Sequence, residues 1–228
     1  MKKIIFTLSL GLIIACDSGD GGDDVGGETG NNALSECGFE SDSYLPIAVG
    51  NSWSFRVVEK GSPEVSSKSQ TIQEELNDPT FGSVFVQVTG KGQDSQTRSL
   101  ISVEDSEVRR MQQEDIDAGV VTKTTVYSPH QTRLSELPED IVDGATWTRT
   151  YTPQVDGVDS LVRVEEWTVE STTAPCELPS GAEVDCLQVR RDRNAGLVVK
   201  TFWFARGVGK VREEGESQDE FLTSCNKN

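Results

Sequence analysis

The chain has 228 residues, of which 35% are hydrophobic and 26% are charged. Acidic residues outnumber basic residues by 38 to 21, which gives a net charge of −17 at neutral pH. Such a surface repels phosphate backbones and anionic lipid headgroups, so nucleic acid is not expected as a partner. The length and the apolar content suit one globular domain.

The first fifteen residues have the pattern of an export signal. Lys2 and Lys3 give a positive start, residues 4–14 are mostly apolar, and Ala15 is the small residue before a cleavage point. The apolar run is much shorter than the roughly 20 residues that cross a bilayer as a helix. We therefore predict a signal peptide at residues 1–15 and not a membrane span.

Ile13-Ile14-Ala15-Cys16 resembles the lipobox of bacterial lipoproteins. The resemblance implies that Cys16 begins the mature protein and holds it to a membrane through acyl chains. Two or more chains anchor stably, whereas one chain binds only marginally. An ordinary secretory signal with a free Cys16 is the alternative. Cleavage removes Lys2 and Lys3 and leaves 19 basic against 38 acidic residues, a net charge of −19.

Residues 16–36 have the composition of a tether. Residues 17–32 are Gly, Asp, Ser, Asn, Glu and Thr with a single Val, which cannot bury enough apolar surface to offset the entropy of ordering. We predict a flexible, acidic, Gly-rich segment. Asp17 resembles the inner-membrane retention signal of enteric lipoproteins, whereas the whole stretch is similar to the tethers of surface-exposed lipoproteins. The outer membrane is the favoured location.

Four cysteines remain in the expected domain, residues 37–228: Cys37, Cys176, Cys186 and Cys225. An even number in an oxidising compartment predicts two disulfides, for which three pairings exist. Cys176 and Cys186 flank the turn signal Pro-Ser-Gly, so a hairpin can bring them face to face and leave Cys37 for Cys225. No Cys-x-x-Cys occurs and the chain has one histidine, so we expect no metal site.

The domain shows the period of two that marks half-buried strands. Trp53, Phe55 and Val57 alternate with polar residues. Similar runs with turn-forming residues between them are 84–88, 97–103, 120–127, 147–151, 161–169, 184–191 and 197–204. We predict a mainly β fold in which an antiparallel sheet curves into a half-barrel or barrel, with few short helices. Residues 109–118 are the segment for which a short helix is the alternative.

One pattern occurs twice in the domain. Residues 45–53 and residues 137–147 both begin with Leu-Pro and end with Gly-x-x-Trp, each before an alternating run. In both copies Pro and Gly set an entry turn, and Trp53 or Trp147 fills the core at the strand start. Either an internal duplication or one device used twice explains the pattern.

The two ends of the domain resemble a loose group of uncharacterised bacterial envelope lipoproteins. The resemblance is carried by residues 44–55, Tyr-Leu-Pro-Ile-Ala-Val-Gly-Asn-Ser-Trp-Ser-Phe, and by residues 203–212, Trp-Phe-Ala-Arg-Gly-Val-Gly-Lys-Val-Arg. Members of that group resemble the open β-barrels of periplasmic lipoprotein carriers. The resemblance implies a concave sheet that can receive an acyl chain.

Catalytic motifs are missing. Residues 207–210, Gly-Val-Gly-Lys, lack the upstream Gly and the following Ser or Thr of a phosphate loop, so we expect a turn there. His130 has no indicated partner for a serine triad. Neighbouring carboxylates at 139–140 and 165–166 do not suit a glycosidase, and we expect solvated surface at both pairs. No catalytic residue and no cofactor is expected.

Six aromatic residues are candidates for core packing or for a ligand platform: Trp53, Trp147, Trp167, Phe202, Trp203 and Phe204. Residues 197–204 are apolar on both faces, which predicts that one face lines a cavity. The leading hypothesis is a non-catalytic envelope lipoprotein that binds an apolar ligand such as a lipid, or an envelope protein, on a curved sheet. The alternative is a structural or interaction module with a solid core, and a hydrolase is the third possibility.

Overall fold

The computed structural model describes residues 37, 39, 41–92 and 94–227. The expected signal peptide, the anchor Cys16 and the tether at 16–36 lie outside the described residues. Within that part of the chain, no helix combines the length and the hydropathy needed to cross a membrane.

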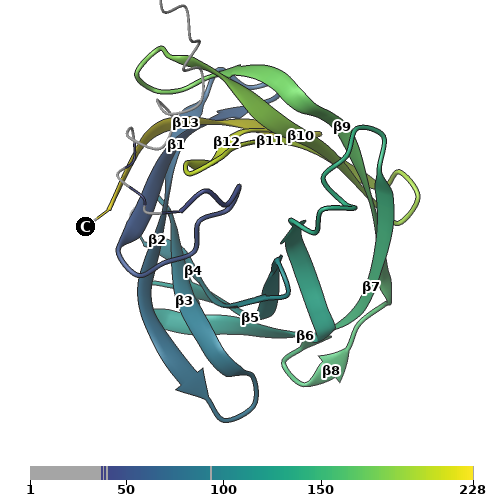
Figure 1. Cartoon of the computed structure of the whole chain (residues 1–228). Helices are drawn as coiled ribbons and strands as arrows, with labels where there is room; N and C mark the ends of the chain where they lie inside the picture. The colour runs from purple at the N-terminus through teal and green to yellow at the C-terminus, as the bar shows by residue number, and fades with distance from the viewer. Residues whose placement is uncertain (1–36, 38, 40, 93, 228) are drawn as a thin grey trace, which may run out of the picture.

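The described chain contains thirteen strands joined into one antiparallel sheet. They are β1 Asn51–Glu59, β2 Val65–Asp78, β3 Gly82–Lys91, β4 Ser95–Glu104, β5 Glu107–Asp117, β6 Val120–Ser135, β7 Thr146–Val155, β8 Val158–Asp159, β9 Arg163–Glu177, β10 Glu183–Arg193, β11 Val198–Ala205, β12 Gly209–Gly215 and β13 Gln218–Lys227. Because β6 pairs with β7 as well as with β5, twelve strands close into a barrel, and the two-residue β8 only extends the edge of β7 (Figure 1). Closure pairs both edges of the sheet.

The mainly β prediction is confirmed, and of its two forms the closed barrel is the one that the chain adopts. The helical alternative for residues 109–118 is wrong, because they belong to β5. The sequence of β5 shows neither the hydrophobic period of a strand nor that of a helix, because both faces of the strand are mostly polar. The long strand β2 is absent from the sequence prediction for a similar reason, since Ile72 is its only fully buried side chain.

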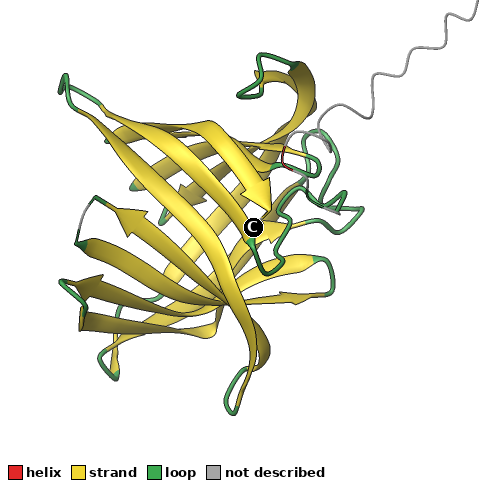
Figure 2. Ribbon diagram, turned by 90° about the vertical axis from the view of Figure 1, so that its left-hand side faces the viewer, coloured by secondary structure: helices red, strands yellow, loops and turns green. Residues whose placement is uncertain are grey.

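The strands run up and down, so their connections gather at two ends (Figure 2). We call the end with the connections 59–65, 91–95, 117–120, 155–163, 193–198 and 215–218 the open end. Backbone hydrogen bonds tie these turns together, for example from Lys60 N to Ser217 O at 2.8 Å and from Ala118 N to Asp94 O at 3.0 Å.

The opposite, closed end is covered by residues 41–50 and 136–145, which Figure 1 shows inside the ring of strands. The two segments hold each other: Ser43 Oγ donates to Glu136 Oε1 at 2.6 Å, and Tyr44 N donates to Glu136 Oε2 at 3.1 Å. Gly207 N, in the turn between β11 and β12, donates to Ser43 O at 2.9 Å. The repeated sequence pattern therefore forms the two halves of one plug.

Both copies of the pattern make the same local structure. Gly50 and Gly144 have positive φ angles of 90° and 79°. Each glycine donates its N–H across the sheet at 2.9 Å, from Gly50 to Ile72 O on β2 and from Gly144 to Val169 O on β9. Six strands, β1 to β6, follow the first copy, and six barrel strands from β7 to β13 follow the second. The barrel thus has two halves with equivalent entries.

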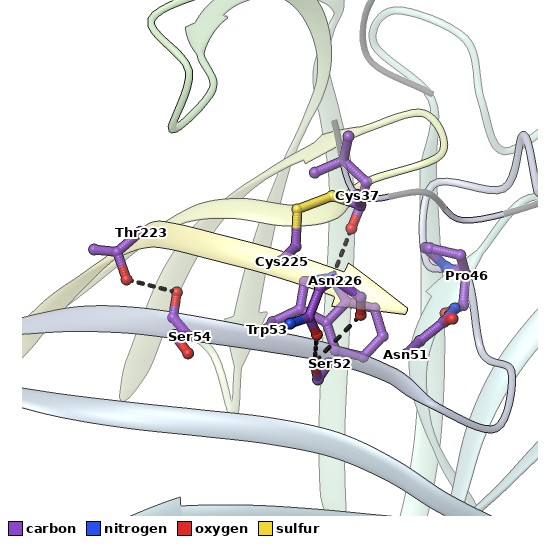
Figure 3. Close-up of a disulfide and its surroundings, with 10 residues drawn as sticks. Cys37, Pro46, Asn51, Ser52, Trp53, Ser54, Thr223, Cys225 and Asn226 are labelled. Atoms are coloured by element: carbon purple, nitrogen blue, oxygen red, sulfur yellow. Dashed lines mark hydrogen bonds between the residues drawn. A yellow bond between two sulfur atoms is a disulfide. The ribbon is translucent and has the colours of Figure 1, made fainter. Parts of the chain in front are cut away.

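Two disulfides join Cys37 to Cys225 and Cys176 to Cys186, the pairing that the turn signal favours. The first bridge fixes the start of the described chain to β13 at the closed end (Figure 3). It lies beside Trp53 of β1, whose strand is joined to β13 by a hydrogen bond from Thr223 Oγ1 to Ser54 O at 3.1 Å.

Candidate functional site

The barrel encloses a chamber of about 550 Å³. Its lining begins among the turns of the open end, with Glu59, Gly92 and Gln218, and continues inward to Phe202 and Lys210. Ten of the twelve barrel strands or their turns contribute to it, because inward-facing residues alternate with outward-facing ones along every strand.

A smaller recess of about 40 Å³ adjoins the chamber toward the closed end. Its apolar lining consists of Leu45, Ile47, Ile101, Val108, Trp167, Phe202 and Phe204. The first two of these residues belong to the plug. The recess and the chamber share Gln70, Arg133, Arg191, Phe202 and Lys210, so these side chains mark the boundary between an apolar and a polar space.

The chamber differs from the apolar cavity expected from residues 197–204. Phe202 and Phe204 do face the interior, and Trp203 lies on the other face, where the Arg212 guanidinium is 4.6 Å from its ring centre. Among the lining side chains of the chamber, however, only Val57, Val198 and Phe202 are apolar. The remaining lining is polar or charged, apart from Gly92.

The lining carries a large excess of positive charge. Its cations are Lys68, Arg110, Arg133, Arg191, Arg193, Lys200 and Lys210, and its carboxylates are Glu59, Glu213 and Glu220. A chain with a net charge of −17 therefore surrounds a cationic interior.

One group of charges, the lysine centre, lies where β2, β11, β12 and β13 meet. Lys210 donates to Glu213 and also to Glu220, the latter at 2.7 Å, while Lys200 pairs with Glu213 and Lys68 with Glu220. Burial, together with the charge of Lys210, lowers the pKa of Lys68 to about 7. Three lysines thus share two carboxylates, and the lowered pKa of Lys68 means that its protonated form is only weakly stabilised.

A second group is centred on Glu165 of β9, which is fully buried. Its Oε1 accepts from Arg193 Nη2 at 2.6 Å and from Tyr151 Oη at 3.0 Å, and Arg191 Nη1 lies 3.8 Å away. Burial alone raises the pKa of Glu165, but Arg191 and Arg193 outweigh burial, so that the pKa lies below its ordinary value. The expectation of solvated surface is wrong for Glu165, because its strand face turns inward, and right for its exposed neighbour Glu166.

Arg110 and Arg133 form the third group, which contains no carboxylate. Arg110 Nη1 donates to Gln113 at 2.8 Å, while its buried Nε has no hydrogen-bond partner. Arg133 makes no side-chain hydrogen bond or ion pair within the described residues. Repulsion from Arg110, together with burial, lowers the pKa of Arg133 to about 10. These two guanidinium groups are the least compensated charges of the interior.

Arg191 connects the charged chamber to the aromatic recess. Its guanidinium lies 5.2 Å from the ring centre of Phe202 and 5.5 Å from that of Trp167, a cation–π arrangement. Trp147, Trp167, Phe202 and Phe204 follow one another with ring centres 5.9 to 6.0 Å apart. Four of the six candidate aromatic residues are therefore one stack, three of them lining the recess.

The other two candidates have separate positions. Trp53 packs edge-on against Phe39, with ring centres 5.2 Å apart, and Trp203 lies beside Arg212. The sequence reasoning missed the cationic lining. A signal was present, because Leu187, Val189, Arg191 and Arg193 share one phase of β10, so that the arginines continue the inward face of the strand.

No protein-family model and no curated protein matches the chain. A Bacteroides fragilis protein assigned as exported, with a YmcC-like fold, superposes with a TM-score of 0.54 and 11% identity over 82% of this chain and 100% of that one. A Parabacteroides distasonis protein assigned as a lipoprotein gives a TM-score of 0.37 and 10% identity over 82% of this chain and 99% of that one. The first likeness extends to the fold alone: this chain is similar in fold to a protein with a YmcC-like fold.

Proposed function

We propose that this protein is a non-catalytic lipoprotein of the cell envelope that holds a small amphiphilic ligand inside its barrel. The chamber carries this proposal. Its volume, about 550 Å³, falls within the roughly 300–1,000 Å³ of small-molecule sites, whereas packed interiors leave few voids larger than a water molecule. A solid-core structural module has no need of such a space.

Because the lining of the chamber is mostly polar or charged, we expect an amphiphilic ligand and not a purely apolar one. The apolar recess, at about 40 Å³, has room for roughly three water-sized groups. A ligand that fills both spaces therefore places a short apolar part against Trp167 and Phe204 and a larger polar part in the chamber. Entry is from the open end, because the plug segments cover the other end.

A non-catalytic role fits the state of the buried carboxylates. Lysines and arginines hold the pKa of Glu165, Glu213 and Glu220 below the ordinary value despite burial. A general acid at neutral pH needs the opposite shift. These carboxylates therefore act as fixed counter-charges that position the cations of the lining.

The envelope location is supported by the export signal, by the lipobox and by two disulfides, which persist in oxidising compartments. The fold likeness to a protein assigned as exported agrees with it. Cys37, bridged to Cys225, lies at the closed end, so the expected tether joins the described domain opposite the open end.

The anchor is tested with Cys16→Ser in the native host. We expect the parent protein to incorporate radiolabelled palmitate and to sediment with outer-membrane fractions, and the variant to lose both properties. A variant that sediments with the membrane as the parent does contradicts the anchor.

Ligand binding is tested on the full-length chain carrying Cys16→Ser, by native mass spectrometry with propyl glucoside and propyl phosphate, whose three-carbon chains match the size of the recess. We expect a one-to-one adduct that Gln70→Trp abolishes, because Gln70 lines both the chamber and the recess. Gln73→Trp, at an exposed position of the same strand, is the matched control and keeps the adduct. Absence of any adduct with the parent, or an unchanged adduct with Gln70→Trp, overturns the proposal.

A second candidate, an interaction module, is favoured by one observation. Exposed apolar side chains occupy three adjacent connections of the open end, with Val120 at 64%, Leu161 at 80% and Leu197 at 72% exposure. Such patches mark protein contacts. A photo-crosslinker at Leu161 in intact cells tests this candidate. We expect one discrete adduct that Leu197→Asp removes, and none from a crosslinker at exposed Glu139 of the plug.

A further inference from the structure

The interior of the barrel has more positive than negative charge, even when every nearby carboxylate is counted. Seven cations line the chamber, against Glu59, Glu213 and Glu220 in the lining and Glu165 behind it. Uncompensated charge is costly away from bulk water. The rest of the chain has ample acidic residues, so the local excess is a property of these inward positions.

Most of the uncompensated charge lies on three arginines. The three lysines of the lysine centre share two carboxylates, and the Arg193 guanidinium is joined to Glu165. Among the described residues, Arg110 and Arg133 have no carboxylate partner, and Arg191 shares Glu165 at the longer distance of 3.8 Å. The buried Nε atoms of Arg110 and Arg191 have no hydrogen-bond partner. Donors of the three side chains are thus left for an acceptor.

The backbone aims Arg133 at this place. In the register of β5 with β6, Val108 is opposite Leu134 and Arg109 is opposite Thr132, so Arg133 is the extra residue of a β-bulge. Gln131, two residues earlier in β6, also lines the chamber, so Arg133 keeps the inward phase of the strand, and the bulge lets the adjoining Leu134 turn inward as well. Arg133 thus lies at the boundary between chamber and recess, which Arg191 of β10 also lines.

We infer that this cluster, Arg110, Arg133 and Arg191, binds an oxyanion group of the ligand, a carboxylate, phosphate or sulfate. The inference rests on the proposed function for the presence of a ligand in the barrel and adds the charge and the position of its polar part. Planar guanidinium groups present paired N–H donors that match two oxygens of such a group. The contacts of Arg191 with Trp167 and Phe202 place the adjoining apolar part of the ligand in the recess.

The test uses calorimetry on the full-length chain carrying Cys16→Ser with three probes: propyl phosphate, propyl glucoside and inorganic phosphate. We expect propyl phosphate to bind more tightly than propyl glucoside by tenfold or more. Arg133→Met is expected to reduce propyl phosphate affinity by roughly tenfold to a hundredfold, the value of a lost charge-assisted contact, and to change propyl glucoside affinity by less than about twofold.

Arg190→Met is the matched control. Arg190 precedes Arg191 on β10, its side chain is 46% exposed on the outer face, and the substitution removes the same charge. We expect it to leave both affinities unchanged. Arg133→Met is also expected to raise the melting temperature of the ligand-free protein, because it relieves repulsion from Arg110. Arg110→Met is the second variant should Arg133→Met fail to fold.

The three probes and the two variants distinguish failure of the anion site from failure of the barrel ligand. Equal affinity of propyl phosphate and propyl glucoside, or equal losses in Arg133→Met and Arg190→Met, overturns the anion site and leaves the barrel ligand standing. Binding of inorganic phosphate that depends on Arg133, without any propyl glucoside binding, supports the anion site and contradicts the amphiphilic ligand. A lower melting temperature of folded Arg133→Met contradicts the uncompensated charge.

Discussion

The indole nitrogen of Trp53 donates a hydrogen bond of 2.6 Å to the carbonyl oxygen of Val208. This contact joins the start of β1 to the turn between β11 and β12, two segments 155 residues apart in the sequence. The turn passes so close to the indole that a Cβ atom on Gly209 would lie 2.9 Å from Trp53 Nε1. The Gly-Val-Gly-Lys sequence is therefore a turn shaped around a tryptophan, and its Lys210 enters the chamber.

Gly209→Ala is expected to destabilise the protein for two reasons, the φ angle of 104° and the clash with Trp53. Gly196→Ala is the matched control, since Gly196 has a φ angle of 91° and open space around its Cβ position. Positive φ costs an alanine about 1–2 kcal/mol. We expect Gly209→Ala to lose a further 1–3 kcal/mol, the usual cost of overpacking, in urea unfolding. Equal losses in the two variants argue against the clash.

Glu165→Gln is expected to lower the free energy of unfolding by about 3–5 kcal/mol at neutral pH, because it leaves the buried Arg191 and the half-buried Arg193 without their carboxylate. Glu166→Gln, at the exposed neighbour, is expected to change it by less than about 0.5 kcal/mol. The folded pKa of Glu165 is lowered, so its contribution is present above the unfolded pKa and is lost as the pH falls through the folded value. Urea titrations from pH 7 to pH 3 should show a smaller decline in Glu165→Gln than in the parent.

The sequence was sufficient for the fold class because Trp53, Phe55 and Val57 keep a strict period of two along β1. It was insufficient where a strand has no apolar face. The strands β2 and β5 are long, and their inward positions face a polar, charged chamber, so hydrophobic periodicity carries no signal there.

The candidate site was predicted only in its apolar part. Trp167, Phe202 and Phe204 were recognisable because large aromatic residues at alternating positions are rare on a solvated face. Arg110, Arg133 and Arg191 were not, because a charged residue on a strand is ordinarily exposed, and the bulge at Arg133 has no sequence signature.

The two disulfides are expected to contribute unequally. The Cys37–Cys225 bridge closes a loop of 188 residues, whereas Cys176–Cys186 closes one of 10. The chain-entropy model gives about 5 kcal/mol for the first and about 3 kcal/mol for the second. Urea unfolding of the two double variants, each with its cysteines replaced by alanine, tests this order. A larger loss from the Cys176 and Cys186 pair would show that local strain or hairpin packing dominates over loop entropy.

Lys68 is expected to make the protein more stable as the pH rises from about 7 to 10. Burial and the charge of Lys210 lower its folded pKa to about 7, while an unfolded lysine keeps a pKa near 10.5. Between these values the unfolded state binds more protons, so the free energy of unfolding increases with pH, by at most about 1.4 kcal/mol per pH unit for one proton.

Lys68→Met should remove this slope, whereas Lys60→Met, at an exposed lysine paired with Asp219, should retain it. Tyr151, whose pKa burial and Glu165 raise, reverses the trend only above pH 10. A parent protein with a flat stability profile across this window, measured by urea unfolding, would show that Lys68 keeps its proton through its contact with Glu220.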